Sequence, residues 1–326
     1  MGVAMGADAL SDVLRAVRLT GAVFFHNDLV GQWVSEPPPA RQCIPYVMPG
    51  AQHLIEYHLV VSGGCWGGLV DGAPIRLAAG DVIVFPQGDS HVVSSAPGLR
   101  GLRPMALLEG AEATQLPFFH RFGDGDGEHT RLICGFLGCD ARPFNPLLAA
   151  LPRMIHLRDE TGDGDGRLAQ FGRIVLAESH AKRAGGEGVL ARVSELMFIE
   201  AVRRHVESLP ADQTGWLAGL RDRFVGRALN LLHGRPGFAW TLEQLAREVG
   251  LSRSALAERF THFVGQPPMQ YLANWRMQVA TGLLANGSDN VAQVAFAVGY
   301  ESEAAFSRAF KRLVGAPPAS WRKAQA

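Results

Sequence analysis

The sequence LAREVGLSRSALAERFTHFVGQPP at residues 245–268 recurs in altered form as VAFAVGYESEAAFSRAFKRLVGAPP at residues 294–318. Apolar residues, glycines and a closing proline match in both copies, with an offset of 49 residues before the central turn and 50 after it. A turn that changes length while the helical faces persist is typical of a duplicated structural unit. Each copy therefore predicts two short helices joined by a turn.

Local signals define the ends of these helices. Thr241 begins a T-x-x-Q capping box, and Ser252 and Ser302 are suited to cap the second helix of each copy. Gly250 and Gly299 stand where a helix ends in a left-handed residue. Helix, glycine-containing turn and helix is the pattern of a helix-turn-helix, whose second helix enters a DNA major groove.

A longer helix is predicted between the two copies, over the segment PPMQYLANWRMQVATGLLANG that ends at Gly287. About 17 residues at ~1.5 Å each span ~25 Å. A rod of that length can hold two recognition helices near adjacent major-groove faces, which lie ~34 Å apart. The repeat therefore predicts that one chain reads two successive groove segments, on DNA that bends to meet both.

Composition is consistent with this assignment. The chain has 326 residues and a formal net charge of zero, but residues 224–326 hold 11 Lys and Arg against 6 Asp and Glu. A basic end favours contact with a polyanion. No apolar run is long enough to span a membrane, and the N-terminal residues lack the features of a secretory signal. The four cysteines form no framework and indicate reduced thiols, so we expect a cytoplasmic protein.

The first two thirds of the chain read differently. Residues 20–135 consist of short apolar runs separated by Gly and Pro, which predicts a small antiparallel barrel or sandwich. Residues 144–210 have apolar residues at helical spacing. We therefore expect an α+β protein, with a β-barrel and a helical segment before an all-α end. The broad apolar face of 189–206 suits either packing on the barrel or a homodimer contact.

Residues 225–323 resemble the DNA-binding domain of the AraC/XylS family of transcriptional regulators. The resemblance rests on LEQLAREVGLSRSALAERF, WRMQVATGLL and VGYESEAAFSRAFKRLVGAPPASWR, although Trp321 stands where the family more often has Tyr. It implies a DNA-binding domain over residues 221–326. The partners it implies are double-stranded promoter or operator DNA, RNA polymerase and a small-molecule effector.

The resemblance also implies which side chains face DNA. They are the outward positions of the two second helices, with one basic residue beyond: Arg253, Ser254, Ala257, Glu258, Glu303, Ala304, Ser307, Arg308 and Lys311. Arg308 is the candidate for direct readout, because a guanidinium pairs bidentately with guanine. Glu258 is suited either to accept from cytosine or to pair with Arg253 or Arg259. Lys311 is a candidate phosphate contact, and Arg276 either a phosphate contact or a structural residue.

The segment GDVIVFPQGDSH at 80–91 resembles the second motif of the cupins, and Gly50 with Glu56 and His58 resembles the first. The later Glu of that first motif is missing. With the helical segment, residues 8–210 resemble the cupin-type sensor and dimerisation domain found in a subgroup of AraC-family proteins.

His58 and His91 suggest a site for one zinc or other divalent ion, completed by Cys134 or Cys65 and by Glu56. The opposing interpretation is two core histidines beside a thiol.

Because the first cupin motif lacks its later Glu, we expect a regulator and not an enzyme. The alternative is a metal-dependent cupin enzyme, of oxygenase or isomerase type, that carries a DNA-binding domain.

Overall fold

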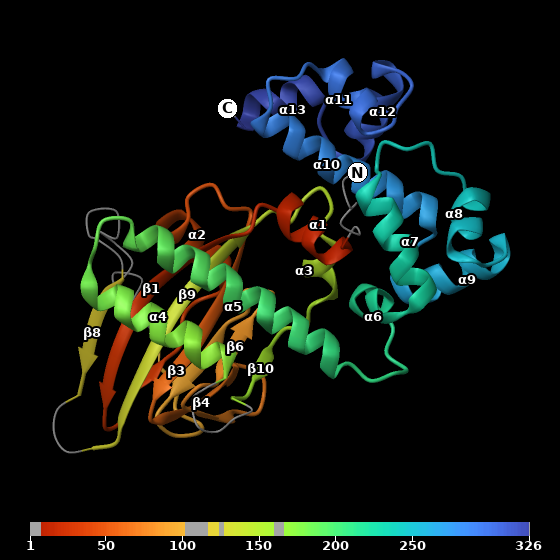
Figure 1. Cartoon of the computed structure of the whole chain (residues 1–326). Coiled ribbons are helices and arrows are strands. Elements are labelled where there is room, and N and C mark those ends of the chain that lie inside the picture. Colours follow the sequence, from red (N-terminus) through yellow and green to blue (C-terminus); the bar gives the residue numbers. More distant parts are fainter. Residues whose placement is uncertain (1–7, 102–116, 124–126, 160–165, 326) are drawn as a thin grey trace. The chain divides into compact units, whose positions relative to one another are not determined.

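A computed structural model describes residues 8–101, 117–123, 127–159 and 166–325 (Figure 1). Contacts divide the chain into two compact units. The sheet unit comprises Leu19–Cys139 and Leu151–Ser208, and the helical unit comprises the chain up to Arg18, Asp140–Ala150 and Leu209–Ala326. Of the helices in these described ranges, none is long and apolar enough to cross a membrane.

Among the residues that the structure describes, the sheet unit contains two sheets. The larger sheet has six strands in the order β10-β6-β3-β9-β1-β8, and the smaller has four in the order β2-β7-β4-β5. Their bounds are β1 Thr20–Val30, β2 Val34–Ser35, β3 His53–Ser62, β4 Gly64–Leu69, β5 Ile75–Ala78, β6 Val82–Phe85, β7 His91–Ser94, β8 Phe118–Phe122, β9 His129–Cys139 and β10 Ile155–Leu157. The predicted α+β class is confirmed, but the described strands form two sheets and not one closed barrel.

Strand β1 shows why the larger sheet has two different faces. Phe25 and Leu29 belong to the apolar core of the unit, whereas His26 and Asp28 stand between them in the sequence. Successive side chains of a strand point to opposite faces. One face of β1 therefore contributes to the core, and the other face carries His26 and Asp28.

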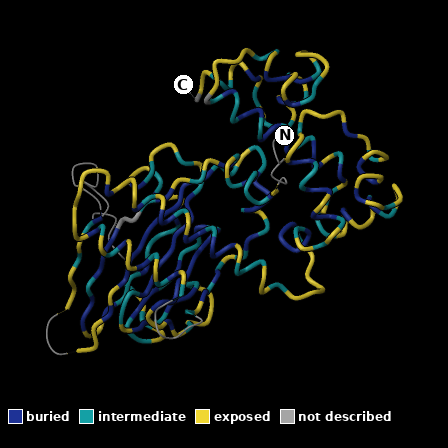
Figure 2. The backbone as a smooth tube through the Cα atoms, in the orientation of Figure 1, coloured by how far each residue is buried: buried dark blue, intermediate teal, exposed yellow. Residues whose placement is uncertain are grey.

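The described part of the sheet unit also includes the helices α2 Ala40–Val47, α4 Arg167–Ala181 and α5 Gly186–Ser208. Helix α5 lies against β1 so closely that a Cβ at Gly21 would be 2.5 Å from the carbonyl oxygen of Ala191. Glycine is the residue that allows such an approach. Val193 and Met197 of α5 are buried, whereas 49% of Leu196 is exposed. Figure 2 shows by colour that the strands of the sheet unit are mostly buried.

The helical unit contains both predicted helix-turn-helix motifs. The first is α8 Leu242–Val249 and α9 Arg253–Val264, and the second is α11 Val291–Ala297 and α12 Glu303–Val314. Helix α10, Pro268–Asn286, joins them, and α1 Ala9–Ala16, α3 Pro146–Ala150, α6 Trp216–Arg221, α7 Arg223–Gly234 and α13 Pro318–Gln325 complete the unit.

The predicted caps are present. Thr241 forms the capping box with Gln244, and Gly250 and Gly299 have φ of +81° and +84°. Ser252 and Ser302 each accept a hydrogen bond from a backbone N–H in the first turn of the helix that follows. A second capping box, formed by Asn290 and Gln293, begins α11. The two motifs therefore begin and end in the same way.

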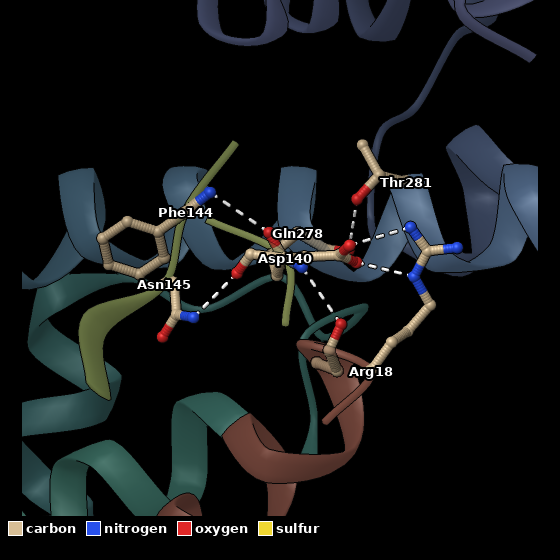
Figure 3. Close-up of polar contacts among 7 residues, drawn as sticks. Arg18, Asp140, Phe144, Asn145, Gln278 and Thr281 are labelled. Atoms are coloured by element: carbon tan, nitrogen blue, oxygen red, sulfur yellow. Dashed lines mark hydrogen bonds and ion pairs between the residues drawn. The ribbon is translucent and has the colours of Figure 1, made fainter. Parts of the chain in front are cut away.

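Two segments from the first half of the chain belong to the helical unit and pack on α10 (Figure 3). Gln278 is 1% exposed, and its Nε2 donates to the carbonyl oxygen of Ala16 at 3.0 Å. Its Oε1 accepts from the backbone N–H of Phe144 at 3.1 Å. Arg18 and Asp140, the last and first residues of these segments, form a two-bonded ion pair of 2.7 and 2.8 Å. Gln278 therefore holds both segments at once.

Candidate nucleic-acid interface and sensor site

The second helix of each motif, α9 or α12, has one buried side and one accessible side. Leu256 and Phe260 of α9, and Phe306 and Phe310 of α12, are fully buried. The predicted DNA-facing residues lie on the other side and are exposed or half-buried: Arg253, Ser254, Ala257, Glu258, Glu303, Ala304, Ser307, Arg308 and Lys311. The structure thus places all nine residues on the accessible surface, four on α9 and five on α12.

The charged residues of α9 differ in how they are engaged. Arg253 pairs with Glu243 at 2.7 Å, and Arg259 pairs with Asp222 at 2.5 Å. Arg253 and Arg259, the two predicted partners of Glu258, therefore pair with other acidic residues. Glu258 remains exposed.

On α12 the basic side chains are available. Within the described residues, Arg308 and Lys311 form no ion pair, and both are exposed. A guanidinium without an intramolecular partner loses no protein contact when it reaches a base edge. Arg308 is therefore better prepared for readout than Arg253, which must first leave Glu243.

Arg276 of α10 has a structural role. Its Nε donates to the carbonyl oxygen of Pro236 and its Nη2 to that of Phe238, both at 2.8 Å. A Cβ at Gly299 would lie 2.7 Å from the same Nη2. The guanidinium therefore fixes the loop before the first motif close to the turn of the second.

The predicted metal ligands form a buried cluster between the two sheets. His58 on β3 lies directly opposite Cys134 on β9, and its Nδ1 is 2.9 Å from the sulfur. Its Nε2 is 2.7 Å from Nε2 of His91, at the start of β7. Asn27 donates to the same sulfur at 3.3 Å, a contact that sequence analysis missed because Asn27 lies in another strand.

This geometry places His58 between the other two predicted ligands. Cys134 and His91 contact opposite nitrogens of one imidazole, so the three donors do not face a common point as placed. In the described part of the chain, no group of three or more His, Cys, Asp or Glu side chains is arranged to hold a metal ion. Cys65 is fully buried, and burial raises the pKa of its thiol to about 12. The zinc prediction is untested and stays a prediction.

The hydrogen bonds of His91 help to determine which ring nitrogens of this cluster carry protons. Its Nδ1 lies 3.0 Å from the carbonyl oxygen of Asp89, which can only accept. Nδ1 of His91 therefore carries the proton, and its Nε2 accepts from His58. Burial lowers the pKa of His91 to about 4, which keeps the ring neutral at pH 7.

Known proteins resemble the chain over both units. A cupin family model matches residues 8–207, and a helix-turn-helix domain model matches residues 245–324. An AraC-like transcription regulator of Streptomyces lividans is 34% identical over 276 residues, covering 84% of this chain and 88% of its own. The regulator AlkR of Acinetobacter baylyi is 28% identical, covering 97% of this chain and 99% of its own.

Among solved structures, the DNA-binding domain of the transcription factor AdpA in complex with a target DNA is 28% identical and covers 32% of this chain and 92% of its own, with a TM-score of 0.31. The family match over residues 8–207, the relative that is 34% identical and the tandem motifs agree on one assignment. The chain belongs to the AraC-like transcriptional regulators that combine a cupin domain with a double helix-turn-helix DNA-binding domain.

Proposed function

We propose that the protein binds promoter or operator DNA by placing α9 and α12 in two successive major grooves. The observation that carries the proposal is the equivalence of the two motifs. Both recognition helices start at a serine cap, end at a left-handed glycine and present their polar side to solvent. Arg308 then reads a base edge, while Lys311 contacts phosphate.

The test uses the full chain and the DNA upstream of its own and neighbouring genes. Gel-shift titration with random duplex of equal length as the competitor measures specific and non-specific affinity separately. A specific site bound ~10³-fold or more tightly than random DNA supports the proposal. Equal affinity for every duplex tried contradicts it.

We propose further that the cupin unit responds to a small-molecule effector and that the regulator acts with RNA polymerase in the cytoplasm. The support is the domain composition, because a cupin unit joined to a DNA-binding unit offers one place for a signal and another for its effect. Run-off transcription from the bound promoter with purified polymerase measures the second claim directly.

A homodimer is the proposed state in solution. Leu196 and Val189 of α5 are 49% and 42% exposed, and Ile174 of α4 is 45% exposed. Apolar groups at this level of exposure are suited to cover one another in a second copy. Light scattering of the full chain should give twice the chain mass, and Leu196→Glu should halve it. An unchanged mass in this variant contradicts the assigned face.

A divalent ion at His58, His91 and Cys134 is a separate proposal. Because the three donors do not converge as placed, a bound ion requires the imidazole of His58 to turn. Elemental analysis of protein purified without a tag decides the question. About one equivalent of metal in the unchanged protein and none in the His58→Ala variant would support the site. Folded protein that contains no metal would contradict it.

A further inference from the structure

A cavity of about 340 Å³ lies at the β8 edge of the larger sheet, mostly on the face opposite its apolar core. Its lining residues are His26, Asp28, Phe119, His120, Arg121, Arg131 and His180. They come from β1, the edge strand β8, β9 and the last turn of α4. The cavity is of a size that fits small ligands, at the lower end of ~300–1,000 Å³.

The strand register separates this cavity from the histidine cluster. Cys134 lies opposite Phe25, whose side chain belongs to the core, so cross-strand neighbours place Cys134 on that face too. His26 follows Phe25 in β1 and therefore points to the other face. His26 thus faces away from the cluster of His58, His91 and Cys134. His120 on the edge strand lies opposite Asn27, which contacts Cys134, and so lines the cavity from the other side of the sheet edge.

His26 is buried without being satisfied. It is 5% exposed, and its Nδ1 has no hydrogen-bond partner among the residues that the structure describes. Oδ1 of the half-buried Asp28, two residues further along β1, likewise has no hydrogen-bond partner among these residues and lies 3.9 Å from Nδ1 of His129. Buried polar atoms in folded proteins are almost always paired with protein, water or ligand. Two such atoms beside one cavity mark it as a place where a polar molecule is held.

Two arginines give the cavity its charge. Arg121 on β8 and Arg131 on β9 both lie opposite Asp28 in the register. Within the described residues neither forms an ion pair, with Asp28 or with any other acid. Burial, with Arg131 and His180 nearby, lowers the pKa of His26 to about 4. The ring is therefore neutral at pH 7, and two guanidinium groups stand against one carboxylate.

An aromatic surface lies beside these charges. Phe119 is 43% exposed, and its ring centre lies 5.0 Å from that of His26. The ring of His180 meets His26 edge-on at 5.1 Å and lies 5.7 Å from the ring of Phe119, so the three rings form one cluster. Nζ of Lys182 lies over the ring of Phe119, 5.5 Å from its centre, so a planar apolar body can lie against the remaining exposed part of Phe119 while its charged end reaches an arginine.

We propose that this outer-face cavity binds a small aromatic anion that carries a carboxylate or phosphate and also a hydrogen-bond donor. The arginines take the anionic group, Phe119 packs on the ring, and Asp28 with His26 receives the donor. Asp28 repels an anion that lacks such a donor and thus selects among ligands. That the ligand is the effector of the regulator rests on the proposed function, whereas binding itself does not.

Calorimetric titration of the full chain, without DNA, tests the site with three probes. These are 4-hydroxyphenylacetate, 4-hydroxyphenyl phosphate and the uncharged 4-ethylphenol. We expect saturable 1:1 binding of the carboxylate or the phosphate, and at least about tenfold weaker binding of 4-ethylphenol. The stronger of the two anions identifies the acidic group that the site prefers.

Variants connect the binding to the cavity. Arg131→Gln should weaken the bound anion about tenfold or more, since it removes a charged donor without disturbing buried packing. Arg41→Gln, at an exposed arginine of α2 outside the cavity, is the matched control and should leave binding unchanged. His26→Gln should also weaken binding. The proposal is overturned if neither anion saturates, or if Arg131→Gln, Arg121→Gln and Arg41→Gln all bind alike.

Measurements of DNA affinity distinguish a failure of the proposed effector role from a failure of the proposed DNA-binding function. DNA affinity measured on the same Arg131→Gln protein should equal that of the unchanged chain when no anion is present. If the anion binds but never changes DNA affinity, the site stands and its role as the effector site is wrong. If DNA binding is non-specific throughout, the proposed function fails whether or not the anion binds.

Discussion

Arg308 and Lys311 lie one helical turn apart on α12, and both are exposed and form no ion pair with any residue that the structure describes. We expect Arg308→Ala to cost ~1–3 kcal/mol of binding free energy at the specific site and to relax one base position, because a bidentate guanine contact is lost. Affinity for random duplex should change far less. Gel-shift titration of both duplexes measures the difference, and equal losses on the two would contradict a readout role.

Lys311→Ala should behave in the opposite way. A phosphate contact carries no sequence information, so its loss should weaken specific and random DNA alike. The dependence of log K on log salt should become shallower by about one. The measurement is the salt series itself, and Arg308→Ala in the same series is the comparison. A loss confined to the specific site would mean that Lys311 reads a base.

His233 makes the helical unit sensitive to acid. It is 4% exposed, its Nε2 is 2.7 Å from the hydroxyl of Tyr271, and burial lowers its pKa to about 3. In the unfolded chain the ring titrates near 6.5, so between these values only the unfolded state binds the proton. Stability present above pH 6.5 is therefore lost as the pH falls, by about 2 kcal/mol at pH 5 from this residue.

Urea unfolding at pH 7.5 and pH 5.0 checks this expectation. His233→Phe removes the titrating ring, which packs on Trp275 with ring centres 4.0 Å apart. The lost hydrogen bond to Tyr271 affects both pH values alike, so the difference between them is the quantity of interest. It should shrink by about 2 kcal/mol in the variant. An unchanged difference would assign the acid sensitivity to other groups.

At the scale of elements, α10 connects more than the two motifs. Gln278→Leu should lower the free energy of unfolding of the helical unit by ~1–3 kcal/mol, because the carbonyl of Ala16 and the N–H of Phe144 lose their partner. Gln270→Leu, on an exposed face of the same helix, should change it by less than ~0.5 kcal/mol. Denaturant titration compares them. Equal small effects would show that the two segments are held by their other contacts.

The elements of the helical unit are predictable from sequence because their signals are local. The T-x-x-Q box, the serine caps and the left-handed glycines each act within one turn, and the structure has them at Thr241, Ser252, Ser302, Gly250 and Gly299. The capping box at Asn290 was overlooked although its signal, N-x-x-Q, is equally local.

The sheet unit is less predictable because strand partners are distant in sequence. Short apolar runs predict strands but not that β8 joins β1 in parallel at an edge, which leaves the described sheets open. The same holds for Gln278: a polar residue on an apolar helix face gives no indication of which backbone groups it serves. The cavity beside His26 is lined by residues of three strands and of the end of a helix. These residues are far apart in the sequence, so no short stretch of sequence predicts the cavity.

At the level of the whole molecule, one chain is proposed to read two successive major grooves, one with each motif. Guanine methylation interference on the specific site, with the full chain, measures this. Each protomer's site should show two clusters of interference about 10 bp apart. Arg308→Ala should abolish one cluster and leave the other in place. A single cluster per protomer, or the loss of both in Arg308→Ala, would contradict the account.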